Sequence, residues 1–249
     1  MTCRSRLANA RYQAEYPKSD PLPTDLPLSA CKLAARSTLL FQVLPAARFL
    51  SYALHPLLMP VFTLWLALEL DLHLSYFMAA ESRLALLGMV ALMSIVFPLT
   101  SALLLKRAGM LTSLEMPRRA DRIAPFTMTL LYQAMTWYLL HKLPLHPLLL
   151  ALFGGAVLAL ALTTMITLRW KISAHMVGIG GCLGAIVALE LMHRMGAFIP
   201  ICGLVLLAGA LGTARLLASD HTPLQVLAGA ALGFACVVAA VTWPIAWPF

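Results

Sequence analysis

Residues 148–168 read LLLALFGGAVLALALTTMITL and contain no charged side chain. About 20 apolar residues in a helix are enough to cross the hydrocarbon core of a bilayer, which is roughly 30 Å thick. The strands of an outer-membrane barrel alternate apolar and polar residues, and this stretch does not. We therefore expect a transmembrane helix over these residues.

The composition of the whole chain extends this prediction to most of the sequence. Of its 249 residues, 61% are hydrophobic and 11% are charged. The chain therefore has more apolar surface than a soluble domain of this length can bury. We expect an all-α, polytopic transmembrane helical bundle with six or seven spans. The expected spans are residues 52–70, 84–105, 124–140, 148–168, 176–192, 198–217 and 224–247.

Two of these segments leave the number of spans open. Residues 52–70 contain Pro56 and Pro60, and residues 124–140 are only just long enough to cross a bilayer core. Prolines are tolerated in a membrane helix where neighbouring groups satisfy the backbone atoms that they leave unpaired. The count is seven, or six if one segment is re-entrant.

The first 50 residues differ in composition from residues 51–249, which we expect to form the transmembrane domain. Residues 1–36 are polar, rich in proline and basic, which predicts a largely disordered leader and not a signal peptide. An interfacial, amphipathic stretch is expected over residues 37–50. The basic leader favours a cytoplasmic N-terminus, but one span more or fewer would reverse the sidedness of the later loops. We expect an integral protein of the bacterial inner membrane.

Small residues are frequent in two of the expected spans. Gly178, Gly180, Gly181 and Gly184 open the fifth span, and a similar group lies near the start of the last. Small residues at such spacing let helix backbones approach closely in membranes. The pattern predicts tight packing between these helices.

Charged and polar residues gather in three loops, at 106–122, 169–175 and 215–221. Two expected spans separate each loop from the next, so all three should emerge on one face of the membrane. Basic residues at helix ends often only fix topology or extend to the interface. Two of these loops, however, each hold a His close to a Ser and an Arg. We interpreted the remaining histidines as interfacial or packing residues: His55, His73, His141, His146 and His193.

An assembly of Arg, Lys, two His and a Ser suits a phosphate monoester or diphosphate. Guanidinium groups bind phosphate oxygens in a bidentate way and neutralise charge on a transferring phosphoryl group. One imidazole can attack phosphorus while the other protonates the leaving oxygen. No carboxylate cluster suited to Mg²⁺ or Ca²⁺ accompanies these residues in the sequence. The predicted chemistry uses no metal and no other cofactor.

The third loop resembles a signature of the type 2 phosphatidic acid phosphatase superfamily. Arg215, five residues and His221 match its Arg and His in spacing, and Ser173-Ala174-His175 resembles the second signature, Pro-Ser-Gly-His. Arg122 with Pro125 loosely resembles the first signature. The likeness covers roughly residues 106–233.

This resemblance implies a helical membrane phosphatase that acts on a lipid phosphate or diphosphate through a phosphohistidine intermediate. His221 would be the nucleophile and His175 the general acid. The phosphate-binding residues would be Arg215, Arg122 and Ser173, with Arg119 or Lys171 as a further cation. Gln225 stands where the superfamily has the acidic residue that orients the nucleophile, and Asp220 is an alternative carboxylate for that role.

Other functions are compatible with the same residues. A protein of this fold could bind or move a phosphorylated lipid without hydrolysing it, which the amide of Gln225 would favour. A secondary transporter fits less well, because the expected spans lack ionisable residues near their middle. Nucleic acid is not expected as a partner, since the basic residues are divided between the leader and membrane-edge loops. The expected partners are membrane lipids and a phosphorylated lipid, among them phosphatidate, phosphatidylglycerol phosphate, a polyprenyl diphosphate, or a phosphorylated sphingoid or lipid A-like molecule.

Overall fold

A computed structural model describes residues 44–76, 78–110, 120–218 and 221–243. The predicted leader over residues 1–36 lies outside these residues, and so do Arg119 and Asp220. Within them the secondary structure is helical and contains no strand, so the all-α prediction is confirmed. After a helix over residues 44–53, the elements are α3 (Met59–Leu70), α4 (Leu72–Ser75), α5 (Ala80–Ala91), the π-helical turn η1 (Leu92–Val96), α6 (Phe97–Arg107), α7 (Ala120–Leu140), α8 (Pro147–Thr167), α9 (Ala174–His193), α10 (Phe198–Ala218) and α11 (Pro223–Thr242).

Five helical segments in the described part of the chain are long and apolar enough to cross a membrane. Four of them are the single helices α8, α9, α10 and α11, and their positions agree with the spans expected from the sequence. The fifth, Ala80–Arg107, is continuous through α5, η1 and α6. These segments identify the chain as an integral membrane protein.

The expected first span, residues 52–70, is wrong as a continuous helix. The helix over residues 44–53 ends before His55, and α3 begins only at Met59 and contains 12 residues. Pro56 and Pro60 explain the break, because proline lacks a backbone N–H and restricts the residue before it. Pro60 lies in the first turn of α3, where proline is well tolerated.

A polar contact joins α7 to the longest span. The π-helical turn η1 contains Ser94, which is fully buried and accepts a hydrogen bond of 2.9 Å from Nε2 of Gln133 on α7. Further along the same span, the hydroxyl oxygens of Ser101 and Tyr132 are 2.7 Å apart. Both contacts come from adjacent residues near the middle of α7 and join it to this span there, although Oε1 of Gln133 has no hydrogen-bond partner in the described part of the chain.

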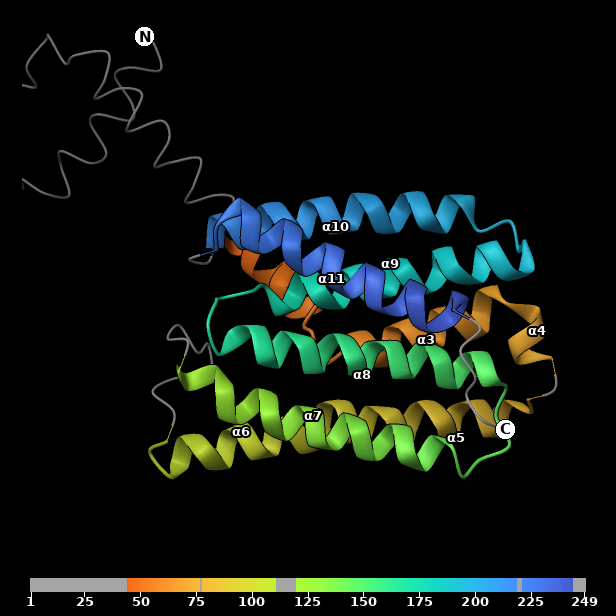
Figure 1. Ribbon diagram of the computed structural model, residues 1–249, viewed down its shortest axis with the longest axis horizontal. Helices are drawn as coiled ribbons and strands as arrows, with labels where there is room; N and C mark the ends of the chain where they lie inside the picture. The colour runs from red at the N-terminus through yellow and green to blue at the C-terminus, as the bar shows by residue number, and fades with distance from the viewer. Residues whose placement is uncertain (1–43, 77, 111–119, 219–220, 244–249) are drawn as a thin grey trace, which may run out of the picture.

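The centre of the bundle is the contact between α9 and α11, which cross each other in Figure 1. A Cβ added to Gly233 of α11 would overlap the carbonyl of Val177 on α9, and one added to Gly184 of α9 would overlap the backbone of Phe234. The predicted close packing of the small-residue helices is therefore confirmed. It also places the backbone N–H of Ser173 3.4 Å from the carbonyl oxygen of Gln225, so two of the sequence motifs are direct neighbours.

The helices alternate in direction and give the bundle two distinct ends (Figure 1). At the left end of that view α7, α9 and α11 begin, and α6, α8 and α10 finish. We call this the cavity end. At the other end, called the opposite end, α3, α7 and α9 finish. Every described polar residue of the three sequence clusters lies toward the cavity end.

Candidate functional site

A cavity of about 240 Å³ penetrates the bundle from the cavity end. Its titratable and charged lining includes residues from segments far apart in the sequence: His55, Arg122, His175, Arg215 and His221. From there the cavity continues past mostly apolar side chains of α7 and α8, including Phe126, Leu152 and Phe153. A cationic mouth thus leads into an apolar interior.

His221 is buried beside the first turn of α11, with 8% of its surface exposed. Its Nδ1 atom is 3.1 Å from Oε1 of Gln225, and the same oxygen accepts the backbone N–H of Thr222 at 3.1 Å. The side chain of Thr222 in turn caps α11 by accepting the Gln225 N–H, which completes a capping box. Because the amide oxygen can only accept, the pattern assigns the proton to Nδ1 and the lone pair to Nε2 of His221.

Burial lowers the pKa of His221 to about 4. The hydrogen bond with Gln225 raises this pKa, while Arg122, Arg215 and Lys171 lower it through their positive charges. The imidazole is therefore neutral at neutral pH. A neutral, oriented ring with its lone pair on Nε2 has the properties of a nucleophile or of a hydrogen-bond acceptor.

His175 is the second residue of α9 and lines the same cavity. Its Nε2 atom is 3.1 Å from the carbonyl oxygen of Ser51. A carbonyl only accepts, so Nε2 carries a proton and Nδ1 is the nitrogen that can gain or release one. The helix over residues 44–53 thus orients a predicted catalytic side chain from outside the three sequence clusters.

His55 is a cavity residue that the sequence analysis missed. We interpreted it as an interfacial or packing histidine, but its ring lines the cavity and contacts that of His175 edge-on, with centroids 5.5 Å apart. Burial lowers the pKa of His55, and the charge of Arg215 lowers it further. The signal in the sequence that could have pointed to His55 is its neighbour Pro56. Proline interrupts the helix there, and the loop between residue 53 and α3 lies at the cavity.

The two arginines at the cavity come from different helices. Arg215 belongs to the last turn of α10, and Arg122 to the first turn of α7, where it is 9% exposed. Both line the cavity, although two helices and more than 90 residues of sequence separate them. Lys171, in the loop between α8 and α9, lies near enough to lower the pKa of His221. Three cations expected from the sequence, Arg122, Arg215 and Lys171, therefore act on one site.

Ser173 lies behind the cavity wall, next to Ala174, which lines the cavity. The serine is fully buried, and its Oγ atom has no hydrogen-bond partner among the described residues. The Oγ atom of Ser51 is likewise buried without such a partner in the part of the chain that is described. Because a buried polar atom left unpaired costs roughly 1–3 kcal/mol, these hydroxyls favour the arrival of a polar ligand or water.

The electrostatics of the cavity suit an anion. Three helices, α7, α9 and α11, direct their N-terminal ends, which carry partial positive charge, toward this end of the bundle. Arg122 and Arg215 add full positive charges. No Asp or Glu lines the cavity within the described residues. A group with several negatively charged oxygens is the ligand that this arrangement stabilises best.

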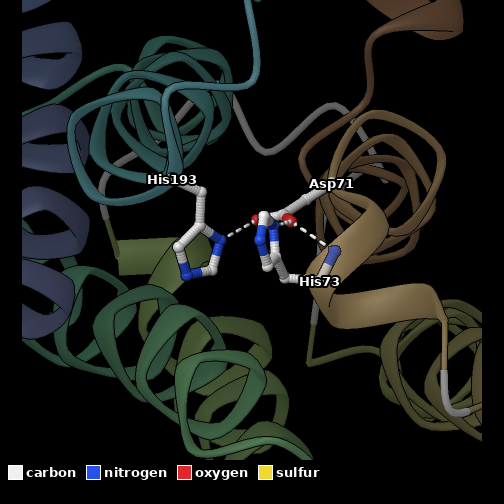
Figure 2. A group of neighbouring side chains, drawn as sticks. All are labelled: Asp71, His73 and His193. Carbon is white, nitrogen blue, oxygen red and sulfur yellow. Dashed lines mark hydrogen bonds and ion pairs between the residues drawn. The ribbon is translucent and has the colours of Figure 1, made fainter.

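A second polar cluster lies at the opposite end of the bundle (Figure 2). Asp71 follows α3 and is fully buried, and the side chains of His73 and His193 surround its carboxylate. The sequence predicts both histidines to be interfacial or packing residues, and no local pattern indicates that they meet. This group, the Asp71 cluster, is separate from the cavity.

Comparison with known proteins returned no match: no family model, no curated protein and no solved structure is similar to this chain. The likeness to the phosphatase signatures rests on short motifs, above all on Arg215 and His221. The convergence of these residues with Arg122 and His175 on one cavity is an independent observation. The site is therefore interpreted from its own chemistry.

Proposed function

We propose that the protein is an integral membrane lipid phosphatase that hydrolyses a lipid phosphate monoester or diphosphate without a metal. The observation that carries this proposal is the pair of His221 and His175 in a cavity lined by two arginines. His221 offers a lone pair on Nε2, and the arginines can bind phosphate oxygens through paired N–H groups. The resemblance to the type 2 phosphatidic acid phosphatase superfamily points to the same reaction.

The proposed topology has seven crossings. Beyond the five apolar segments, α7 has 21 residues and a length of about 30 Å, enough to cross a bilayer core. The other crossing is interrupted: Ser51 and His55 lie beside His175 at the cavity end, whereas Asp71 lies beside His193 at the opposite end, so the chain through α3 passes along α9 from one end to the other. By the same resemblance we assign residues 51–249 to the phosphatase-like domain and place the protein in a bacterial inner membrane.

In the first step, Nε2 of His221 attacks phosphorus, and the bond between phosphorus and the leaving oxygen breaks. Nδ1 keeps its proton, which Gln225 accepts in a hydrogen bond at 3.1 Å. The protonated form of His175 delivers its Nδ1 proton to the leaving alcohol or phosphate, while Nε2 stays bound to the Ser51 carbonyl. The negative charge of the bound phosphate favours this protonated form of His175.

In the second step, water attacks the phosphohistidine. His175, now neutral, accepts a proton from that water at Nδ1, and the bond between phosphorus and Nε2 of His221 breaks. Inorganic phosphate leaves, and both histidines return to their initial states. Arg122 and Arg215 stabilise the charge on the phosphoryl oxygens throughout, which is the largest contribution expected from such a site.

The apolar interior of the cavity supports a lipid as the substrate. Leu152, Phe153 and Phe126 line the part that lies beyond the arginines. Apolar surface gains roughly 25 cal/mol for each Å² removed from water, so this lining favours a hydrocarbon chain over a soluble phosphate ester. The headgroup would then be held at the cavity end while the chain stays in an apolar environment.

A second candidate is a protein that binds or moves a phosphorylated lipid without hydrolysing it. The observation that favours it is the neutral amide of Gln225 in the position next to His221. An amide orients the ring but does not stabilise an imidazolium by charge. In a serine protease, replacing the orienting carboxylate by an amide lowers turnover by about 10⁴-fold.

The test is release of inorganic phosphate from a panel of lipid phosphates and diphosphates in detergent, with EDTA present. We expect release by the native protein and its loss, by about 10³-fold or more, in His221→Ala. His141→Ala is the matched control, because this half-buried histidine lies at the opposite end and contacts Trp137 instead of the cavity. Trapping of a radiolabelled phosphate on native protein, in a form stable to alkali and labile to acid, would identify phosphohistidine.

The two candidates give different results in this experiment. Absence of release from every substrate, in protein that is folded and still binds the lipids, would reject the phosphatase and favour the binding protein. Release that persists in His221→Ala would reject His221 as the nucleophile.

A further inference from the structure

The carboxylate of Asp71 has no exposed surface and meets two imidazoles (Figure 2). Its Oδ2 atom is 2.5 Å from Nδ1 of His193, and its Oδ1 atom is 3.4 Å from Nδ1 of His73. Oδ1 also accepts the backbone N–H of His73 at 2.9 Å. Asp71 forms no ion pair with Lys or Arg among the described residues. Within the described ranges, the side chains that pair with this carboxylate are histidines.

One histidine would be enough to pair with the charge of Asp71, but the fold brings more than one to it. The rings of His73 and His193 have centroids only 4.7 Å apart. His146, at the start of α8, is a further neighbour: burial lowers its pKa most, His193 and His73 lower it as well, and Asp71 raises it. Imidazoles that converge on a buried carboxylate are a common donor set for a transition-metal ion.

We propose that Asp71, His73 and His193 bind a divalent transition-metal ion at the opposite end of the bundle, and that Zn²⁺ fits this donor set best. One ligand atom from each of the three residues lies within 4.8 Å of the other two. Zinc binds nitrogen and carboxylate oxygen at about 2.0–2.2 Å in a tetrahedron. The three atoms must therefore close by a small amount around the ion, with water in the fourth position.

The exposure of the three side chains is consistent with such a closure. His73 is the most accessible member, because 70% of its side chain is exposed, compared with 18% for His193 and none for Asp71. The buried pair would form the fixed part of the site, and the ring of His73 would complete it from solvent. The backbone N–H of His73 on Oδ1 holds the carboxylate in place, as hydrogen bonds around metal ligands commonly do.

A bound ion would link two segments that are distant in the sequence. Asp71 and His73 lie in the connection after α3, and His193 is the last residue of α9. An ion held by all three side chains would join these segments through coordination bonds.

The test uses the full-length protein in detergent, purified by an affinity tag that contains no histidine. Zinc is measured by elemental mass spectrometry, and its affinity by competition with a chromophoric chelator. We expect about one Zn²⁺ per chain in the native protein and visible d–d absorption of a four-coordinate ion after replacement by Co²⁺. Replacing His73 by Ala should weaken Zn²⁺ binding by at least about tenfold and change the Co²⁺ spectrum.

His141→Ala is the control, since this histidine also lies at the opposite end but directly follows α7, and its Nδ1 atom is 2.8 Å from the Trp137 carbonyl oxygen. It should bind Zn²⁺ like the native protein. His73→Ala is preferred over Asp71→Ala because the exposed side chain can be removed with little effect on folding, which size-exclusion chromatography checks. Equal Zn²⁺ binding by the native protein and His73→Ala would overturn the proposal, and so would the absence of Zn²⁺ binding by the native protein. Either result would leave a simple Asp71–His193 pair.

Phosphate release is not the readout here, so failure of the metal site and failure of the phosphatase remain distinguishable. A loss of zinc in His73→Ala without loss of phosphate release would support both proposals.

Discussion

The Nδ1 atom of His221 lies 3.1 Å from the Oε1 atom of Gln225, one helical turn further along the chain. This single contact fixes the tautomer of the ring, because the same oxygen already accepts the Thr222 N–H. Gln225 therefore orients the imidazole ring of His221 without adding a negative charge. The neutral partner also explains why nothing offsets burial strongly enough to keep the pKa of His221 above about 4.

Replacing Gln225 by Glu should therefore increase turnover. The carboxylate can still accept the Nδ1 proton and complete the capping box, and it would stabilise positive charge on the phosphohistidine. We expect kcat to rise by about tenfold, less than the 10⁴-fold by which charge and tautomer together change turnover in a serine protease. Gln225→Met is the control, because it keeps the length of the side chain, removes the acceptor and should lower kcat. A Gln225→Glu protein that is folded but no faster would show that orientation alone matters.

The pH dependence of kcat/KM should report the low pKa of His221. Only the neutral ring has a lone pair for attack, so kcat/KM must fall as pH decreases through the pKa of the unliganded enzyme. That pKa is lowered from 6.5 to about 4, and the acidic decline is therefore expected near pH 4 and not near pH 6.5. In Gln225→Glu the decline should move to higher pH. An acidic decline near pH 6.5 in the native protein would contradict the burial of a neutral His221.

Arg122 should contribute to phosphate binding although its sequence motif is the least specific of the three. Removing its guanidinium in Arg122→Ala should raise KM by about 10- to 100-fold, because hydrogen bonds to charged groups are worth roughly 1.5–3 kcal/mol. Arg107→Ala is the matched control, since Arg107 lies at the same end of the bundle but is exposed and outside the cavity. Equal KM values for the two variants would mean that Arg122 faces the cavity without binding substrate.

The contact between α9 and α11 should tolerate no side chain at Gly233. A methyl group there would overlap the carbonyl of Val177, and relieving such an overlap typically costs about 1–3 kcal/mol. We expect Gly233→Ala to lower the thermal midpoint in detergent, and to lower activity as well, since the same contact places Ser173 beside Gln225. Gly209→Ala is the control. No atom lies within 4 Å of an added Cβ at Gly209, and alanine favours the helix by up to about 1 kcal/mol.

The spans that were predicted correctly are those in which local sequence decides the structure. Residues 148–168 and 198–217 are predominantly apolar for the length of a bilayer core, and the helices α8 and α10 follow them closely. Residues 52–70 are also predominantly apolar but contain Pro56 and Pro60 in and just before α3. Whether a proline interrupts or only bends a membrane helix depends on what surrounds it, and a single sequence does not contain that information.

The difference between local and long-range determinants also explains which residues of the two polar sites could be predicted. The motif around His221 could be found because its residues are neighbours in the sequence, and the parity of the spans then brought in His175. His55 was missed because it reaches His175 across 120 residues. His193 was missed for the same reason, since it meets Asp71 from 122 residues away. A lone histidine at a helix end has no local pattern that distinguishes a ligand from a packing residue.

The helix α9 carries His175 as its second residue and His193 as its last, roughly 27 Å apart along its axis. In a membrane, these two side chains therefore face different aqueous compartments. Under the proposed function, the leaflet that would deliver a phosphorylated lipid to the arginines is not the one that borders the Asp71 cluster. In sealed vesicles with one orientation, a chelator that cannot cross the bilayer would reach one end only, while substrate and released phosphate exchange at the other. The metal ion and the lipid would then reach the protein from opposite sides of the membrane.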